Sequence, residues 1–226
     1  MVREALLLAG SYLLGSVPFG LLVARSWAGV DVREHGSGNI GATNVFRVAG
    51  RKAGAAAMAL DVGKGLVPPL AGAALGLPVA WQVAAGLAAI VGHSLSPFLR
   101  FRGGKGIATS LGVMMGVMWK VGASATVLWG IVIGTTGYVS LGSVVAAASL
   151  TPLCVAFYPG DGARLAFAVI AGVLAIVRHR SNLARLRDGA ENCFHKSPPP
   201  IAAAAAIACA SLGVAIALAL AANILR

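Results

Sequence analysis

The feature that most constrains the fold is a set of long segments without charge. Residues 201–225 run for 25 positions without a charged side chain, whereas a helix needs about 18 to 20 apolar residues to cross a bilayer. The chain of 226 residues is 58% hydrophobic and 11% charged, and its mean hydropathy is +0.85. This composition is far from that of a soluble domain. We therefore expect an all-α fold, a polytopic transmembrane helix bundle.

Charges, prolines and glycine clusters divide the chain into eight helical segments, about seven in the core and one appended at the C-terminus. The expected ranges are 4–24, 53–76, 79–98, 106–119, 121–137, 141–157, 163–180 and 201–225. The fourth, at ~21 Å, is too short to cross comfortably. The first is expected to be a retained helix and not a signal peptide, because it has no clear cleavage site.

The "HKSPPP" segment, residues 195–200, predicts a stiff linker, because successive prolines cannot continue a helix. We therefore divide the chain into a single membrane domain, 1–195, and a segment 196–226 that holds the linker and the extra helix. The three cysteines, Cys154, Cys193 and Cys209, have no metal-like spacing. The acidic residues are scattered, and we expect neither a metal nor a cofactor.

The formal charge of +11 would suggest a nucleic-acid partner in a soluble protein, but in a membrane protein it indicates cytoplasmic loops. With the N-terminus outside and strict alternation, the inside segments carry 13 of the 18 Lys and Arg residues. This asymmetry predicts an N-out topology with all large polar stretches on the cytoplasmic face. Contacts with membrane lipid are expected there, and contacts with nucleic acid are not.

The first polar stretch is "SGNIGATNVFR", residues 37–47. Small residues let a backbone turn tightly and bring N–H groups close to an anion. If a helix begins near Ala42, Asn44 and Arg47 share a face, whereas an ordinary capped loop is the plainer interpretation. The candidate residues for anion binding are Ser37, Gly38, Asn39, Thr43, Asn44 and Arg47.

The second polar stretch is "GHSLSPFLRFRGGKGIAT", residues 92–109. It holds a glycine-hinged basic turn that leads into a helix, and such a turn can cradle phosphate with backbone donors, a point charge and the positive helix end. Its spacing is not that of a P-loop, and a lipid-headgroup contact is the plainer alternative. The candidates are Gly103, Gly104, Lys105 and Thr109; His93, like His35, is a weaker one.

The third polar stretch is "RHRSNLARLRDGAE", residues 178–191. Its arginines could anchor to anionic lipid, but His179 and Asn182, spaced i, i+3, are not needed for that. Asp61 and Lys64, also i, i+3, are costly inside an apolar segment, and either a structural ion pair or a substrate role would explain them. Ser140 and Ser143 are expected to be packing or capping serines, and their depth places them beside the same membrane face.

Taken together, the three stretches resemble the three motifs of the bacterial acyl-phosphate:glycerol-3-phosphate acyltransferases, and the resemblance extends to "GSVPFG" at 15–20 and "YVSLGS" at 138–143. It covers roughly residues 4–195. It implies an enzyme of the bacterial inner membrane that transfers a fatty acyl group from acyl phosphate to the 1-hydroxyl of glycerol 3-phosphate, giving lysophosphatidic acid. Two departures are Arg102, where the family often has lysine, and the additional C-terminal helix.

The resemblance also implies residue roles. Ser37 and Arg47 would be needed for activity, the second motif would bind glycerol 3-phosphate, and His179 with Asn182 would be catalytic. Glu191 would support the structure, and Ser143 would lie in the substrate site. The implied residues of the second motif are Gly103, Gly104, Lys105 and Thr109.

The mechanism and the class of function have alternatives. No G-x-S-x-G elbow is present in the sequence, which favours direct attack by the glycerol hydroxyl over an acyl-enzyme. Either His179 or the phosphate of the donor could accept the proton. A transporter would place its site near the membrane midplane, and a lipid-binding scaffold would not need the His179 and Asn182 pair.

Overall fold

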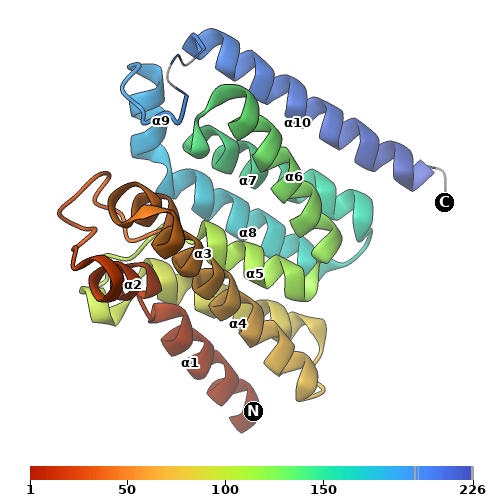
Figure 1. Cartoon of the computed structure of the whole chain (residues 1–226). Helices are drawn as coiled ribbons and strands as arrows, with labels where there is room; N and C mark the ends of the chain where they lie inside the picture. The colour runs from red at the N-terminus through yellow and green to blue at the C-terminus, as the bar shows by residue number, and fades with distance from the viewer. Residues whose placement is uncertain (196, 198, 225–226) are drawn as a thin grey trace. The chain divides into compact units, whose positions relative to one another are not determined.

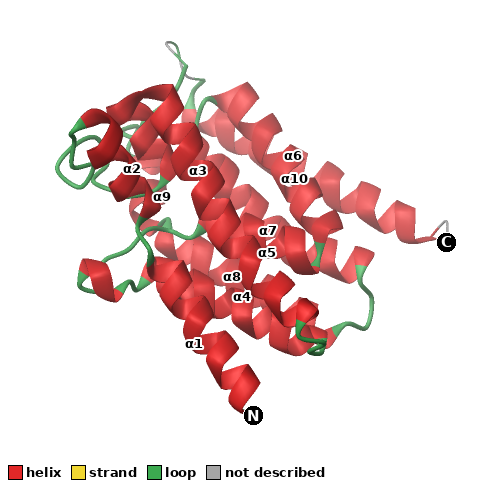
Figure 2. Ribbon diagram, turned by 60° about the horizontal axis from the view of Figure 1, so that its bottom comes forward, coloured by secondary structure: helices red, strands yellow, loops and turns green. Residues whose placement is uncertain are grey.

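In the computed structural model, residues 1–195, 197 and 199–224 are described, and every regular element among them is a helix (Figure 1; Figure 2). The all-helical prediction is therefore confirmed. Lys196, Pro198, Leu225 and Arg226, in the expected linker and at the end of the last helix, lie outside the described residues. The elements are α1 (Val2–Ser16), α2 (Phe19–Ala28), α3 (Ala42–Ala74), α4 (Val79–Ser94), the 3-10 helix η1 (Pro97–Leu99), α5 (Ile107–Val117), α6 (Trp119–Thr136), α7 (Val139–Phe157), α8 (Gly162–Arg178), α9 (Arg180–Arg187) and α10 (Ile201–Ile224).

The chain divides into two compact units, Met1–Val117 and Met118–Arg226. Within the second unit α10 packs on α6 and α7, and the expected division at residues 195 and 196 stays a prediction. By length and composition, four stretches of the described chain can cross a membrane, or five if the bent pair α8 and α9 forms one span. α5 has 11 residues, about 16 Å of helix, so this segment is short, as expected.

The first expected helix, 4–24, is in fact two helices separated at Val17 and Pro18. Proline cannot continue a helix and restricts the residue before it, and Val17 is extended, with φ −60° and ψ 120°. The buried Lys64 ammonium of α3 donates a hydrogen bond of 2.8 Å to the Val17 carbonyl oxygen. The break therefore exposes a carbonyl group that a charged side chain from another helix satisfies.

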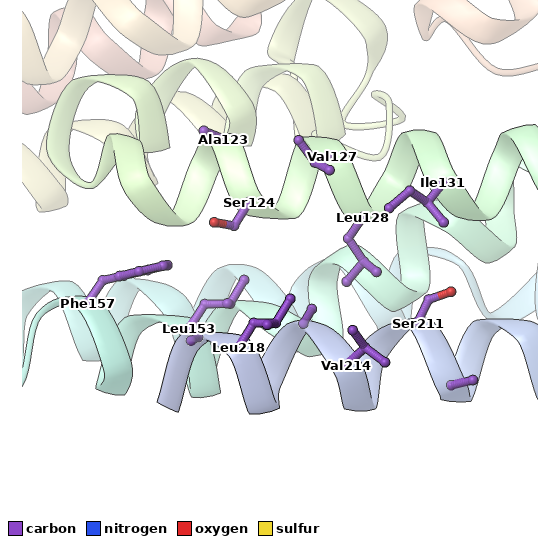
Figure 3. A pocket seen from close by; sticks show the side chains of 13 residues that line it. Ala123, Ser124, Val127, Leu128, Ile131, Leu153, Phe157, Ser211, Val214 and Leu218 are labelled. Atoms are coloured by element: carbon purple, nitrogen blue, oxygen red, sulfur yellow. The ribbon is translucent and has the colours of Figure 1, made fainter. Parts of the chain in front are cut away.

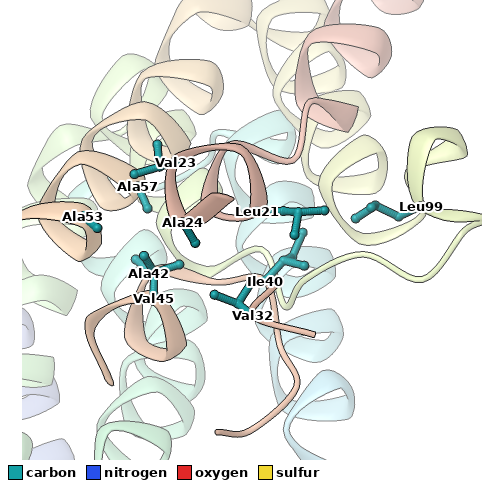
Figure 4. Close-up of a cluster of buried hydrophobic side chains, with 10 residues drawn as sticks. All are labelled: Leu21, Val23, Ala24, Val32, Ile40, Ala42, Val45, Ala53, Ala57 and Leu99. Carbon is teal, nitrogen blue, oxygen red and sulfur yellow. The ribbon is translucent and has the colours of Figure 1, made fainter. Parts of the chain in front are cut away.

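α3 begins at Ala42 and not near residue 53 as expected, so the end of the first polar stretch is helical. The apolar run begins only after Arg51 and Lys52, which is why the sequence placed the boundary there; Gly50, with φ 87° and ψ 174°, kinks the helix at this point. The early turns are held by a buried apolar cluster to which α3 contributes Ala42 and Val45 (Figure 4). The cluster comprises Leu21, Val23, Ala24, Val32, Ile40, Ala42, Val45, Ala53, Ala57 and Leu99.

α3 and α5 approach each other closely at two glycines. A Cβ on Gly65 would lie 2.0 Å from the carbonyl oxygen of Thr109, and a Cβ on Gly112 would lie 2.0 Å from that of Val62. Small residues allow helix backbones in membrane bundles to approach in this way. The contact fixes the first turns of α5, and hence the basic turn that precedes it, against α3.

In the second unit, α7 lies against α6, α8 and α10, and α9 touches both α7 and α8. The expected helix 163–180 ends at Arg178, and the chain continues into α9 after a bend of 52°. α9 carries three arginines, Arg180, Arg185 and Arg187, in its eight residues, and it leaves the direction of the apolar α8 at this bend. His179 stands at the break itself.

α10 packs on α6 and α7 through Ala208, which is buried with Leu128, Val132 and Val145. Further along α10 the helices enclose an apolar pocket of about 640 Å³ (Figure 3). Leu153 and Phe157 of α7 line it together with residues of α6 and α10. Ser124 and Ser211 supply its side-chain hydroxyls, and the latter donates to the Ile207 carbonyl of its own helix. Such a lining suits hydrocarbon and cannot hold a phosphate.

Candidate active site

The first polar stretch forms a loop that is organised around the buried side chain of Asn44. Its Nδ2 donates to the carbonyl oxygens of Val32 at 2.8 Å, His35 at 3.1 Å and Asn39 at 2.9 Å. Its Oδ1 accepts from the backbone N–H of Ser37 at 2.8 Å. Asn44 is 2% exposed, and these bonds make it the residue that shapes the loop.

We expect Asn44→Ala to lower the free energy of unfolding by about 2 to 3 kcal/mol, because buried backbone groups would lose their partner. Asn44→Asp should be at least as harmful, since a carboxylate cannot donate to three carbonyl groups. Denaturant unfolding in detergent micelles measures both effects. Wild-type stability together with a raised KM for glycerol 3-phosphate would instead show that Asn44 acts mainly on the ligand.

The beginning of this loop is held by Asp31, which the sequence did not single out. Its carboxylate accepts from Arg33 Nε at 2.9 Å and from Arg25 Nη2 at 2.5 Å. The hydrogen bonds from Arg33 hold the pKa of Asp31 well below its ordinary value, so the carboxylate stays charged at physiological pH. The backbone oxygen of Asp31 also lies 3.0 Å from His35 Nδ1. This places His35 in the loop scaffold.

The remaining candidates of the first stretch lie along the loop and the start of α3. Ser37 and Gly38 are exposed, and Gly38 has a φ of 68°, which favours glycine. Asn39 Oδ1 accepts from the N–H of Gly41 at 2.8 Å, at the residue before α3. Thr43 and Arg47 are both half-buried and lie one helical turn apart. Thr43 and Arg47, spaced i, i+4, therefore place a hydroxyl and a guanidinium at this end of α3, whereas the amide of Asn44, which was expected beside Arg47, donates to the loop.

The second polar stretch forms the predicted glycine-hinged turn, and α5 begins directly after it at Ile107. The N–H of Gly103 donates to the Ser94 carbonyl oxygen and that of Gly104 to the His93 carbonyl oxygen, each at 3.1 Å. The expectation that these two amides cradle a phosphate therefore needs correction, because they already bind the end of α4. Lys105 and the first turn of α5 follow these two amides directly, and both stay candidates for contact with an anion.

Two features of this turn are typical of a ligand site. Arg100 and Phe101 have φ values of 51° and 61°, a left-handed conformation that costs non-glycine residues about 1 to 3 kcal/mol each. Ser94 Oγ and Thr109 Oγ1 are buried without a hydrogen-bond partner among the described residues. Ser94 Oγ would lie 3.5 Å from a Cβ on Gly106, so this hydroxyl is beside the turn. Buried hydroxyls without partners suit a bound polar molecule.

In the third polar stretch, His179 has a defined tautomer. It is 3% exposed, and its Nδ1 lies 2.8 Å from the carbonyl oxygen of Ala175. A carbonyl group can only accept, so Nδ1 carries the hydrogen, and in the neutral ring Nε2 is the basic nitrogen. The break between α8 and α9 therefore presents an imidazole that is oriented to accept a proton at Nε2.

Asn182, in the first turn of α9, is held by Glu191. The Asn182 Nδ2 donates to Glu191 Oε1 at 2.6 Å, and Arg185 Nε donates to Glu191 Oε2 at 2.8 Å. The Glu191 side chain is 4% exposed, so its charge is satisfied by these two partners. The carboxylate fixes the orientation of the Asn182 amide and ties the end of the stretch to α9.

The start of α7 is tied to the segment after α9. The N–H of Phe194 donates to the Gly137 carbonyl oxygen at 3.0 Å, and Tyr138 packs in one buried cluster with Leu186 of α9. Ser143 Oγ donates to the Val139 carbonyl oxygen at 2.9 Å and keeps its lone pairs for another donor. Ser140 Oγ is buried without a partner in the part of the chain that the structure describes. The second unit therefore gathers His179, Asn182 and these serines around α7, α8 and α9.

The described residues contain no group of three His, Cys, Asp or Glu side chains placed to hold a metal ion. Taken separately, the two units offer candidate residues that are cations, hydroxyls, amides and imidazoles. This chemistry suits anions and proton transfer.

Comparison with known proteins identifies the family. The family model described as Glycerol-3-phosphate acyltransferase matches residues 5–189. Glycerol-3-phosphate acyltransferases of Geobacter sulfurreducens and Geobacter metallireducens are 47% and 50% identical over 194 residues, which is 86% of this chain and 99% of each relative. α10 lies beyond the family match.

Comparison with solved structures points to the same family. PlsY (YgiH), an integral membrane glycerol 3-phosphate acyltransferase, is 40% identical in its glycerol 3-phosphate form, with a TM-score of 0.80 over 85% of this chain and 96% of that chain. Its lysophosphatidic acid form gives a TM-score of 0.78. These findings confirm the resemblance found in the sequence and favour an enzyme over a transporter or a scaffold. The chain belongs to the glycerol-3-phosphate acyltransferase family.

Proposed function

We propose that this enzyme transfers a fatty acyl group from acyl phosphate to the 1-hydroxyl of glycerol 3-phosphate. The hydroxyl oxygen attacks the carbonyl carbon, the bond between that carbon and the phosphate oxygen breaks, and lysophosphatidic acid and inorganic phosphate are formed. Acyl phosphate is a mixed anhydride with a good leaving group, so positioning and charge stabilisation can supply most of the acceleration.

The observation that carries the mechanism is the orientation of His179. Its Nδ1 donates to the Ala175 carbonyl oxygen, so its Nε2 can take the proton of the attacking hydroxyl. The proton then passes to the departing phosphate, and the neutral ring is restored. Asn182, held by Glu191, is assigned to orient the reacting groups beside it.

The anion-binding residues are assigned to the first unit and to α7. Lys105 and the start of α5 are assigned to the phosphate of glycerol 3-phosphate, together with Arg47 and Thr109. The role of Gly103 and Gly104 is to form the turn that carries Lys105, since their amides bind α4. The loop with Ser37, Gly38 and Asn39 is assigned to substrate contact, together with Thr43 at the start of α3, and Asn44 is assigned to the shape of the loop. Within the second unit, Ser143 is assigned to substrate contact.

We place the N-terminus outside and the reaction at the cytoplasmic face of the bacterial inner membrane. The support is the uneven distribution of basic residues, 13 of 18 in the segments assigned to the inside. A site at that face lets the water-soluble acceptor meet an acyl chain dissolved in the bilayer.

A donor competition with the purified protein tests the proposal. Labelled glycerol 3-phosphate is offered with palmitoyl phosphate, palmitoyl-CoA or palmitoyl-acyl carrier protein, and lysophosphatidic acid is followed. We expect product from palmitoyl phosphate alone; product only from a thioester would overturn the donor assignment.

The same assay in sealed vesicles should give product only when the cytoplasmic face is outward, because the charged acceptor does not cross the bilayer. Product only from vesicles of the opposite orientation would reverse the topology.

A further inference from the structure

Helix α4 ends in a buried histidine that faces an acidic side chain. His93 is 4% exposed, and its Nδ1 lies 3.7 Å from Asp61 Oδ1 of α3. Asp61 is 2% exposed and is paired with Lys64 Nζ at 2.8 Å. The carboxylate is thus held on one side by the ammonium group and faces the imidazole on the other. The carboxylate therefore lies beside the ring on the α3 side, slightly beyond hydrogen-bond distance.

The opposite edge of the His93 ring lies against the glycine-hinged turn. A Cβ on Gly104 would be 2.2 Å from His93 Nε2 and 3.0 Å from its Cε1. The ring therefore fills the space that a side chain at residue 104 would need. The His93 backbone adds a second link, because its carbonyl oxygen accepts the Gly104 N–H at 3.1 Å. His93 therefore contacts Gly104 in two ways: its carbonyl oxygen binds the Gly104 N–H, and its ring lies where a side chain at residue 104 would be. Lys105 is the next residue.

We infer that His93 is a positioning residue for the glycine-hinged turn. Asp61 orients the imidazole, the imidazole supports Gly104, and Gly104 sets the direction in which Lys105 leaves the turn. This inference rests on the assignment of Lys105 to the phosphate of glycerol 3-phosphate. His93 acts through its neighbours, so its loss should weaken binding of the acceptor more than it slows the reaction of bound substrate.

The first test is the split between KM and kcat. We expect His93→Ala to raise the KM for glycerol 3-phosphate about 10-fold or more, with kcat within about threefold and the KM for the acyl donor within about twofold. An unchanged acceptor KM, or an equal loss in both KM values, would overturn the inference. His93→Asn, whose amide can still face Asp61, is measured in parallel. It provides a second variant for the KM measurement if His93→Ala does not fold.

The second test adds a side chain at residue 104, which is a glycine. Gly104→Ala should raise the acceptor KM strongly, because its Cβ would collide with the imidazole. In the double variant His93→Ala and Gly104→Ala the collision is gone, so the acceptor KM should return to that of His93→Ala alone. Such a non-additive result is typical of two residues in contact. Equal effects of Gly104→Ala with and without His93 would contradict the contact.

Gly103 provides the matched control. A Cβ on Gly103 would lie 2.0 Å from the His93 carbonyl oxygen, a backbone atom that His93→Ala retains. The defect of Gly103→Ala should therefore persist in the His93→Ala background, and relief there would contradict the geometry. Lys105→Met separates the two proposals. If it leaves the acceptor KM unchanged, the phosphate assignment fails; if it raises that KM and His93→Ala does not, only the positioning role fails.

Discussion

We expect His179→Gln to lower kcat by about 10²- to 10⁴-fold, the usual worth of a general base, and to change the KM for glycerol 3-phosphate little. Glutamine retains a polar side chain but cannot take up a proton at neutral pH. The buried His179 has its Nδ1 committed to the Ala175 carbonyl oxygen, so the basic nitrogen that glutamine removes is Nε2. A loss confined to kcat indicates an interaction made in the transition state.

Steady-state kinetics with palmitoyl phosphate and glycerol 3-phosphate measures this loss. The control is His195→Gln, which changes an exposed histidine of the segment after α9 and should leave turnover unchanged. Thermal unfolding in detergent confirms that both variants fold. If His179→Gln keeps turnover within tenfold of wild type, the histidine is not an obligatory base, and the phosphate of the donor must accept the proton.

The helices and the chemistry of the polar stretches could be predicted because both depend on local sequence. An apolar run, a proline or a glycine cluster acts on its own neighbourhood. The sequence thus predicted a helix directly after the GGKG turn, but it placed the start of the long apolar helix at residue 53, 11 residues later than the structure does. The kink at Gly50 accounts for this difference.

The partners of the polar groups could not be predicted, because they depend on which helices pack together. The sequence offered Gly103 and Gly104 as phosphate ligands, yet their amides bind the last carbonyl groups of α4. It left Asp61 and Lys64 open between an ion pair and a substrate role, and the structure pairs them. The link from Lys64 to Val17 spans 47 residues, and no spacing rule connects them.

This buried pair leads to the largest expected change in stability. Asp61 and Lys64 are 2% and 3% exposed, so removing one partner leaves a charge in a medium that solvates it poorly. Breaking such a pair typically costs about 3 to 5 kcal/mol. We therefore expect Asp61→Leu to lower the free energy of unfolding in detergent micelles by that amount, because the Lys64 ammonium would keep the Val17 carbonyl and the face of the Phe19 ring but lose its counter-charge.

Removing both charges should cost less than removing one. A buried ion pair replaced by apolar residues is often neutral or stabilising, but Lys64→Met also leaves the Val17 carbonyl oxygen without its donor, a loss of about 1 to 3 kcal/mol. The double variant Asp61→Leu and Lys64→Met should therefore have a higher free energy of unfolding than Asp61→Leu alone and a lower one than wild type. Additive losses would mean that the two charges do not interact in the folded protein.

Asp161 and Arg164 form the matched control, since they are also an i, i+3 pair but lie at the start of α8 with side chains 27% and 22% exposed. Water already solvates both groups, so Arg164→Met should cost only about 1 kcal/mol or less. The contrast separates burial from charge: the same spacing and the same charges give a large loss only where water is excluded. A loss at Arg164 as large as that at Asp61 would show that detergent, and not burial of the pair, determines the effect.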